Sequence, residues 1–274
     1  MLKTTDAMPA GDVLTERVRA TWMDGDFGVI APSFEGGAAG FVTRLGVAPG
    51  AAVLDVACGT GNTALPAARA GAQVTAIDIA PNLLEQLGSR AAREGLGLDI
   101  HEGNCEALPF DDDRFDTVIT MYGAMFAARP QRAAAELLRV CRPGGVVAMA
   151  NWTRTGFIGS MLRATLAFVP APADVPSPLL WGDEAIVQER LGSAARLTFQ
   201  RHMMPFHFPV PPAGVVDLFR SYYGPTKRAF DRLDSEQRAA FHTSLTDLWT
   251  AHNQATDGTT YVESEYLEVI GVKN

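Results

Sequence analysis

The order of apolar and polar positions predicts a repeated strand and helix pattern between residues 51 and 152. The run AAVLDVA at 51–57 is largely apolar without alternation, which is typical of a strand buried on both faces. An alanine-rich helix that ends at Gly71 follows it, and then a strand QVTAID and a helix over 81–92. Three more strands, LDIHEG, FDTVITMYG and GGVVAMANW, and a helix over 131–140 complete the pattern. Because strand and helix keep alternating, we expect a parallel sheet with helices on both faces.

Other patterns flank this region. Two short helices are expected over 12–24 and 32–45, where apolar residues have near-helical spacing. After Trp152, the segment FVPAPADVPSP carries four prolines and is expected to be a loop. A short helix EAIVQERLG and a strand ARLTFQRHM follow, and PFHFPVPP is expected to break that strand. Amphipathic helices over 213–223 and 235–252 come before a last strand, TYVESEYLEVIGV.

Composition and charge narrow the function classes. The chain has 274 residues and a formal net charge of −8 at pH 7. Affinity for nucleic acids comes largely from neutralised phosphates, so an acidic chain without a dense Lys and Arg block is not expected to bind them. No apolar run approaches the length that spans a bilayer, and residues 1–14 lack a signal-peptide pattern. We therefore expect a cytoplasmic protein with no membrane partner.

The cysteines point to no special chemistry. Cys58, Cys105 and Cys141 are odd in number and far apart along the chain. This spacing indicates neither a disulfide framework nor a zinc site. We expect small buried thiols and no bound metal.

The stretch VLDVACGTGNTALP at 53–66 raises the question of a ligand, because two glycines come directly after the first strand. Glycine tolerates positive φ, so Gly59 and Gly61 let a backbone loop approach a ligand closely. Asp78 ends the second strand, where a carboxylate can accept hydrogen bonds from both ribose hydroxyls of an adenosine. These residues predict an adenosine-containing cofactor at the carboxyl ends of the strands.

The glycine pattern by itself leaves the cofactor open. Asn62 stands where the Gly-Lys-Ser/Thr pattern of a P-loop requires Lys, whereas residues 59–64 match the dinucleotide pattern G-x-G-x-x-G/A. Asp55 lies just before the loop, where a carboxylate would repel a pyrophosphate but would tolerate a cationic ligand. An NAD-dependent oxidoreductase stays an alternative at this point.

Four segments carry a family resemblance. DVACGTGN, VTAIDIA, GNCEALPF and LLRVCRPGG follow one another along the chain. They resemble the first motif, the acidic second strand, the adenine segment and the turn before the fifth strand of class I S-adenosylmethionine-dependent methyltransferases. The likeness covers about residues 47–152 and extends to the small-molecule, ubiquinone-biosynthesis-like branch. It implies an α/β fold with a Rossmann-like, doubly wound sheet of seven strands, mostly parallel with an antiparallel last strand, and a helical cap.

The resemblance also implies a division of the chain. The N-terminal helices would cover the cofactor site, the core would bind S-adenosylmethionine, and the cap would be inserted before the final core strand. The expected boundaries of these four parts are 1–46, 47–203, 204–258 and 259–274.

Roles for single residues follow from the resemblance. Backbone groups of Ala57, Gly59 and Gly61 would hold the methionine portion of S-adenosyl-L-methionine, and Asp78 its ribose hydroxyls. Asn104 stands where many relatives have Asp, and its carbonyl oxygen can still accept from the adenine amino group. The expected cofactor contacts are Trp22, Phe27, Asp55, Ala57, Gly59, Gly61, Asp78, Ile79, Asn104, Cys105, Glu106 and Tyr122.

The substrate side has no sharp motif. Methyl transfer is an in-line displacement that depends mainly on alignment, and a general base is needed only for some acceptors. His207, Tyr222 and Tyr223 lie in the cap region and are the candidate catalytic residues. We expect a small-molecule methyl acceptor. A catalytically silent protein that binds the cofactor is the remaining alternative.

Overall fold

A mixed sheet forms the centre of the molecule. The computed structural model describes residues 3–4, 12–172 and 175–274. Within them, eight strands pair in the order β1-β4-β3-β2-β5-β6-β8-β7. The strands are β1 (Lys3–Thr4), β2 (Ala52–Val56), β3 (Gln73–Asp78), β4 (Leu98–Glu102), β5 (Phe115–Met121), β6 (Cys141–Trp152), β7 (Ala195–Phe208) and β8 (Thr260–Lys273).

The pairing confirms the expected fold class. Strands β2 to β6 run parallel to one another, and β8 is antiparallel to both β6 and β7. The central strands are buried on both faces: Val53, Leu54 and Val56 of β2 are fully buried. The two-residue strand β1, which the sequence did not predict, pairs with β4 and extends the sheet at that edge.

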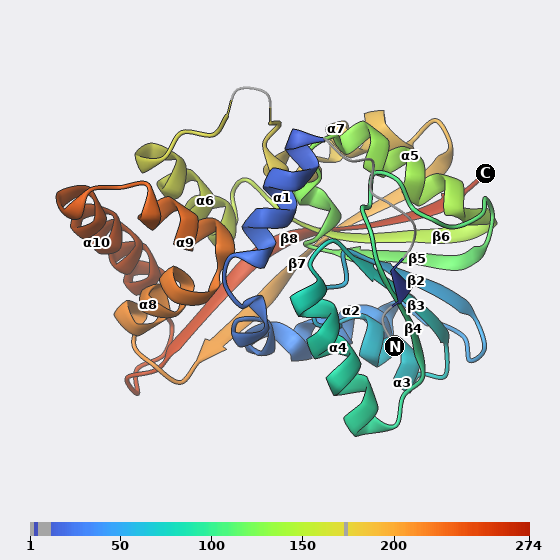
Figure 1. Cartoon of the computed structure of the whole chain (residues 1–274), viewed down its shortest axis with the longest axis horizontal. Coiled ribbons are helices and arrows are strands. Elements are labelled where there is room, and N and C mark those ends of the chain that lie inside the picture. Colours follow the sequence, from blue (N-terminus) through green and yellow to red (C-terminus); the bar gives the residue numbers. More distant parts are fainter. Residues whose placement is uncertain (1–2, 5–11, 173–174) are drawn as a thin grey trace.

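Helices cover both faces of the sheet (Figure 1). On one face lie α2 (Glu35–Leu45), α3 (Ala64–Arg69) and α4 (Pro81–Glu94), and on the other lie α5 (Pro130–Val140) and α7 (Glu184–Leu191). The helix α4 shows how sequence sets such an element. Pro81 opens it, Gly95 ends it in a left-handed conformation, and Leu83, Leu84, Leu87 and Ala91 form its buried stripe.

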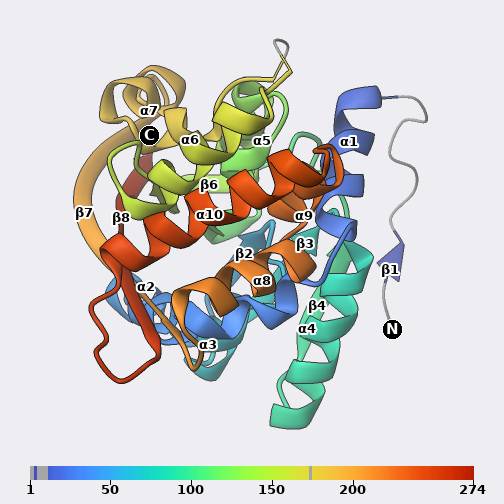
Figure 2. The same ribbon diagram turned by 90° about the vertical axis from the view of Figure 1, so that its left-hand side faces the viewer.

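A group of helices gathers at one end of the sheet. These are α6 (Phe157–Phe168), α8 (Pro212–Tyr222), α9 (Gly224–Asp231) and α10 (Ser235–His252), and we name these four helices the cap. Figure 2 looks onto this end and shows α10 in front, between α6 and α8, against both of which it packs. Trp249 of α10 is fully buried against Phe157, Phe208 and Phe219.

The N-terminal segment lies between this group and the sheet. It comprises α1 (Val13–Met23), followed by two 3₁₀ turns at Phe27–Val29 and Ala31–Phe34. In Figure 1, α1 lies in front of the sheet, between the cap helices and α4 and α5. The C-terminal half of α1 packs against α9, where a Cβ on Gly224 would lie 1.9 Å from the backbone oxygen of Thr21.

The structure corrects three expectations about elements. Strand β7 does not break at Pro205 but continues to Phe208. This strand is at the edge of the sheet, where a proline without an N–H group is tolerated. The helices α6 and α9 were not predicted, because the first follows a strand closely and the second is only eight residues long.

Two expectations concern the membrane and the N-terminus. In the parts of the chain described above, no helix has the length and apolar character needed to cross a membrane. The stretch on which the absence of a signal peptide was predicted lies mostly outside the described residues, as does part of the proline-rich loop, at 173–174.

Candidate functional site

A pocket opens at the carboxyl ends of β2, β3 and β5, and we name it the strand-end pocket. Its empty volume, which includes the open mouth, is about 970 Å³. Its lining residues are Thr15, Val18, Trp22, Phe27, Ala31, Phe34, Ala57, Cys58, Gly59, Thr60, Asn62, Thr63, Asp78, Ile79, Leu83, Gly103, Asn104, Cys105, Glu106, Met121, Tyr122, Gly123, Phe126 and Ala127.

The loop after β2 forms the floor of this pocket. Ala57, Gly59 and Gly61 all have positive φ, at 56°, 53° and 87°. Gly61 packs tightly, since a Cβ there would lie 2.3 Å from the side chain of Leu87. Glycine at this position therefore allows both the turn and the close contact with α4.

Asp55 holds the loop from behind. Its Oδ2 accepts a hydrogen bond of 2.6 Å from the hydroxyl of Thr63, and its Oδ1 has no partner among the described residues. Burial raises the pKa of the Asp55 carboxyl to about 7. Asp55 does not line the strand-end pocket, so its contribution to a ligand site is indirect.

Asp78 links β3 to the same loop. Its Oδ2 accepts from the backbone N–H of Gly59 at 2.8 Å, and its Oδ1 accepts from that of Ala80 at 2.9 Å. Burial raises the pKa of this carboxyl, while the backbone donors act in the opposite direction. Each oxygen has accepting capacity left for a ligand hydroxyl, because a carboxylate oxygen can accept two hydrogen bonds.

Asn104 begins the segment that forms the opposite wall. Its Oδ1 accepts from the backbone N–H of Glu106 at 2.9 Å, and its Nδ2 donates to the hydroxyl of Thr15 at 3.3 Å. Asn104 therefore forms a local turn and also contacts α1. Beside it, burial raises the pKa of the Cys105 thiol to about 12, so this thiol is protonated and unreactive at neutral pH.

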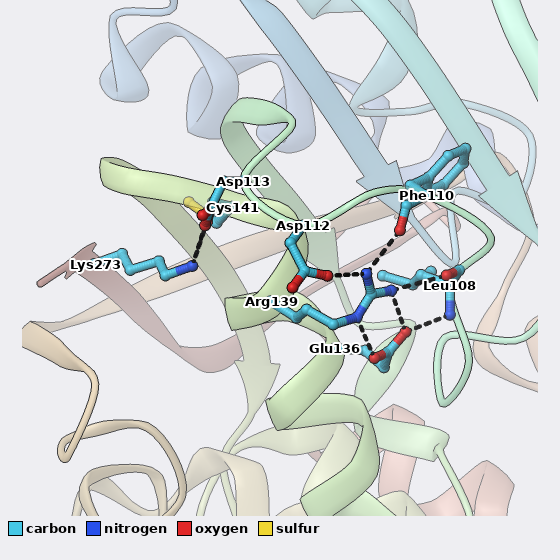
Figure 3. A network of polar contacts seen from close by, with 8 residues as sticks. All are labelled: Leu108, Phe110, Asp112, Asp113, Glu136, Arg139, Cys141 and Lys273. Carbon is cyan, nitrogen blue, oxygen red and sulfur yellow. Dashed lines mark hydrogen bonds and ion pairs between the residues drawn. The ribbon is translucent and has the colours of Figure 1, made fainter.

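A polar network fixes the chain that follows this segment (Figure 3). The guanidinium of Arg139 on α5 donates to the backbone oxygens of Leu108 and Phe110, at 2.9 and 2.7 Å. It also forms a two-point pair with Glu136 and reaches Asp112 at 2.8 Å. Arg139, which belongs to the LLRVCRPGG motif, thus fixes the segment after Asn104 against α5.

The helix α1 covers the strand-end pocket on its outer side and is held in place at its N-terminus by an ion pair. Thr15, Val18 and Trp22 of α1 line the pocket. Asp12 caps α1 and pairs with the guanidinium of Arg129 through both oxygens, at 2.5 and 2.6 Å. The same guanidinium donates to the buried carboxylate of Glu106 at 2.9 Å. Glu106 therefore joins α1 to the pocket wall.

Tyr122 lies at the end of β5 in an unusual conformation. Its φ is +57°, and its ring stacks on Trp152 with centroids 3.6 Å apart and planes inclined by 10°. Next to it, a Cβ on Gly123 would lie 2.5 Å from that of Ala57. Non-glycine residues with a positive φ, such as Tyr122, have a strained backbone and concentrate at functional sites. The Tyr122 ring borders the strand-end pocket and a second pocket behind it.

We name this second cavity the aromatic pocket. It shares the walls Trp22, Phe27, Phe34, Tyr122 and Phe126 with the strand-end pocket, so the two cavities are neighbours. Its lining residues are Trp22, Phe27, Ile30, Phe34, Tyr122, Phe126, Trp152, Ile158, Met161, Phe206, Phe219 and Tyr223.

Most residues singled out in the sequence come together at these cavities. The lining of the strand-end pocket includes ten of the expected cofactor contacts: Trp22, Phe27, Ala57, Gly59, Asp78, Ile79, Asn104, Cys105, Glu106 and Tyr122. The other two, Asp55 and Gly61, lie behind and within the loop and shape it. Tyr223 is buried and lines the aromatic pocket.

His207 and Tyr222 line neither pocket, so the structure gives no support to their expected catalytic role. His207 is exposed on β7, with the buried Phe206 and Phe208 on either side of it. Side chains alternate along a strand, so His207 points away from these two neighbours. Tyr222 is 38% exposed at the end of α8.

Sequence reasoning missed several aromatic walls. Phe34, Phe126, Phe206 and Phe219 line the aromatic pocket, but none of them lies in a recognisable motif. For Phe206 a signal existed, since strand alternation carried through Pro205 would have turned it inward. The other three come from turns and a helix whose positions depend on tertiary packing.

Comparisons with known proteins agree with this geometry. A family model described as "Methyltransferase domain" matches residues 54–149. The uncharacterized protein Rv1405c of Mycobacterium tuberculosis is 40% identical over 252 residues, which are 91% of this chain and 91% of that protein. The demethylmenaquinone methyltransferase of Renibacterium salmoninarum is 35% identical over 152 residues, covering 53% of this chain and 62% of that enzyme.

Solved structures share the fold at low sequence identity. The YcgJ protein of Bacillus subtilis superposes with a TM-score of 0.60 and 18% identity, over 87% of this chain and 99% of that one. The [4+2]-cyclase SpnF superposes with a TM-score of 0.55 and 18% identity, over 87% of this chain and 80% of that one. The fold alone therefore does not determine the reaction.

Proposed function

We propose that this chain, which belongs to the family of class I S-adenosylmethionine-dependent methyltransferases, binds S-adenosylmethionine and transfers its methyl group to a small-molecule acceptor. The observation that carries the proposal is the pair of neighbouring cavities. The strand-end pocket and the aromatic pocket share the wall of Tyr122. A methyl donor in the first would face an acceptor in the second.

The strand-end pocket suits the donor in its shape and charge. Asp78 would accept from the ribose hydroxyls, while Ile79 and the segment around Asn104 and Cys105 would contact the adenine. Backbone groups of Ala57 and Gly59 would hold the methionine portion. All of these residues line one pocket, which supports the assignment.

The charge of the lining disfavours the NAD alternative. Asp78 and Glu106 are acidic, and the described residues that line the strand-end pocket include no Lys or Arg. Glu106 is paired with Arg129, but no cation is paired with Asp78 in the described residues. A pyrophosphate would therefore lie close to the Asp78 carboxylate, whereas a ligand with a sulfonium and an ammonium group would be attracted to it. This difference supports S-adenosylmethionine over a dinucleotide.

The chain would contribute alignment and the exclusion of water. When bound, S-adenosylmethionine supplies a methyl group on a positively charged sulfur. Tyr122 borders both cavities, so we expect its ring beside the transferred methyl group. Trp22 and Phe27 cover the same region from the N-terminal segment. Holding two reactants in line in this way can lower a barrier by roughly 7–11 kcal/mol.

Calorimetric titration tests the proposal directly. We expect S-adenosylmethionine and S-adenosylhomocysteine to bind with micromolar affinity and NAD not to bind. Asp78→Ala should weaken binding of both by about 10- to 100-fold, because it removes a charged hydrogen-bond acceptor. Asp257→Asn, which changes an exposed carboxylate away from both pockets, is the matched control.

The outcomes separate the alternatives. Binding of NAD alone would identify an oxidoreductase-type site and overturn the proposal. Binding of the methyl donor without transfer to any acceptor in a broad panel would identify a catalytically silent protein. Equal affinity of Asp78→Ala and the unmodified chain would remove Asp78 from the site.

A further inference from the structure

The aromatic pocket contains the chemistry that would select an acceptor. Nine of its twelve lining residues are Phe, Tyr or Trp, and the other three are Ile30, Ile158 and Met161. The described residues that line it include no Asp, Glu, His, Lys or Arg. The Tyr122 and Trp152 rings stack face to face and form one wall. Such a cavity fits a flat, apolar molecule.

We propose that the acceptor is an uncharged aromatic molecule that enters the aromatic pocket and accepts a hydrogen bond from the Tyr223 hydroxyl through an oxygen atom. This inference rests on the proposed methyl transfer and names the substrate class of the same site. In this assignment Tyr223 is a positioning and specificity residue, and the aromatic rings supply the contact area.

The lining argues against a charged acceptor. A charge moved from water into an apolar cavity needs a partner of opposite charge. Arg44 and Glu268 are the charged residues that interact electrostatically with the Tyr122 hydroxyl. These two side chains form an ion pair of 2.5 Å with each other, so neither is free to pair with a charged acceptor. A cation would gain attraction from ring faces, but the described residues that line the pocket include no carboxylate to neutralise it. An uncharged ring system avoids both difficulties.

The two hydroxyls of the pocket differ in their surroundings. The Tyr122 hydroxyl also has no hydrogen-bond partner in the described parts of the chain, but it is fully buried and therefore closed to a ligand, whereas the Tyr223 hydroxyl is not among the fully buried atoms. The Tyr223 hydroxyl has no hydrogen-bond partner among the described residues, and its ring contacts Trp22 and Phe27, which line both pockets. Burial raises the pKa of Tyr223 above its usual value, so this group is protonated at neutral pH and can donate. A donor without a partner favours a ligand that carries an accepting oxygen.

Four naphthalene probes of similar size test the proposal. Equilibrium dialysis at pH 7.5 would measure the binding of 1-naphthol, naphthalene, the 1-naphthoate anion and the 1-naphthylmethylammonium cation, with and without saturating S-adenosylhomocysteine. We expect 1-naphthol to bind at least about tenfold more tightly than either ion, because burying an unpaired charge is unfavourable.

The hydroxyl is tested by a matched pair of variants. Tyr223→Phe should weaken 1-naphthol by about 5- to 15-fold and leave naphthalene within about twofold, because only the hydrogen bond is lost. Tyr222→Phe changes the neighbouring, exposed tyrosine outside the pocket and should leave both probes unaffected. Thermal melting curves of both variants would check that they fold.

The possible results are distinct. Tightest binding of the cation would overturn the proposal and identify a cage for ammonium groups. Equal binding of 1-naphthol by Tyr223→Phe and the unmodified chain would overturn the role of the hydroxyl. The proposed function is tested separately, since failure of S-adenosylhomocysteine to bind would refute it while the probe affinities without that ligand still report on the pocket.

Discussion

Asp55 and Asp78 are buried carboxylates at the ends of adjacent strands, and their environments differ in one respect. Asp78 accepts from two backbone donors through its two oxygens. Asp55 accepts from Thr63 through one oxygen, and the other is buried without a partner among the described residues. Such a group is costly to ionise. The residue that shapes the loop thus opposes stability at neutral pH.

The pKa of Asp55 gives a prediction about stability. Burial raises it to about 7 from the usual value of 3.8 for an aspartate side chain. Between these pH values the folded chain binds the proton more tightly than the unfolded chain. The stabilising contribution of the protonated Asp55 carboxyl to the free energy of unfolding is therefore fully present below about pH 4. It is lost as the pH rises to about 7. In Asp55→Asn the free energy of unfolding should fall less steeply over this range, by at most about 1.4 kcal/mol per pH unit.

Urea unfolding at pH 4.5, 5.5 and 6.5 would measure this difference. Other carboxyls contribute in the opposite direction, since the pKa of Asp116 is lowered by its pair with Arg142. Their effect is common to both proteins and cancels in the comparison. Parallel pH profiles for the two proteins would show that Asp55 is ionised in the folded chain.

At the scale of elements, the pocket wall depends on a helix that does not line it. The segment that follows β4 forms one wall of the strand-end pocket, and α5 packs behind this segment. Arg139 of α5 holds the segment through hydrogen bonds to the backbone oxygens of Leu108 and Phe110 (Figure 3). Glu136 completes the link, because its carboxylate accepts from the backbone N–H of Leu108 at 2.6 Å. The arginine and the glutamate therefore act as one unit between helix and loop.

We predict that Arg139→Met loosens this wall. It removes hydrogen bonds to two backbone oxygens and leaves Glu136 without its cation, so unfolding should become easier by about 1–3 kcal/mol. The affinity for S-adenosylhomocysteine should fall in the same variant, because Asn104 and Cys105 belong to the same segment. Chemical unfolding and calorimetry would measure the two effects.

Arg139→Lys is the informative control. Lysine keeps the positive charge, but its ammonium group lacks the planar arrangement of donors with which the guanidinium binds Glu136 and the backbone oxygens at the same time. We expect an intermediate loss of stability. A result identical to that of the unmodified chain would mean that the charge alone holds the segment and that the forked geometry has no effect.

At the scale of the whole molecule, the cap and the sheet share their longest strands. β7 and β8 pair over 14 residues, from the far end of the sheet to the cap. The core of the cap forms where these strands end, with Trp249 against Phe208. Because β7 and β8 run through the sheet and pack against the cap, we expect the two parts to unfold together.

Leu245→Ala tests this expectation within the cap. Leu245 is buried on α10, so its truncation should lower stability by about 2–5 kcal/mol. Differential scanning calorimetry should show one transition that moves as a whole to lower temperature. Thr243→Ala, at an exposed position of the same helix, should leave it in place. A second transition that stays at the original temperature would show that the cap unfolds separately.

The sequence by itself determined the core of this protein and the place of its site. Glycines at positive φ, an acidic residue at a strand end and runs of apolar residues act over a few positions, so their effects can be predicted locally. The parallel sheet, the loop with Gly59 and Gly61 and the pocket position of Asp78 follow from such signals.

Only the tertiary structure decided the aromatic pocket. The aromatic pocket takes Trp22, Phe126, Trp152, Phe206 and Tyr223 from five segments far apart in the chain. Their convergence depends on how α1, β7 and the cap pack, which no local pattern encodes. The same packing set Tyr223 inward and left Tyr222 exposed, because adjacent residues at the end of α8 point in different directions.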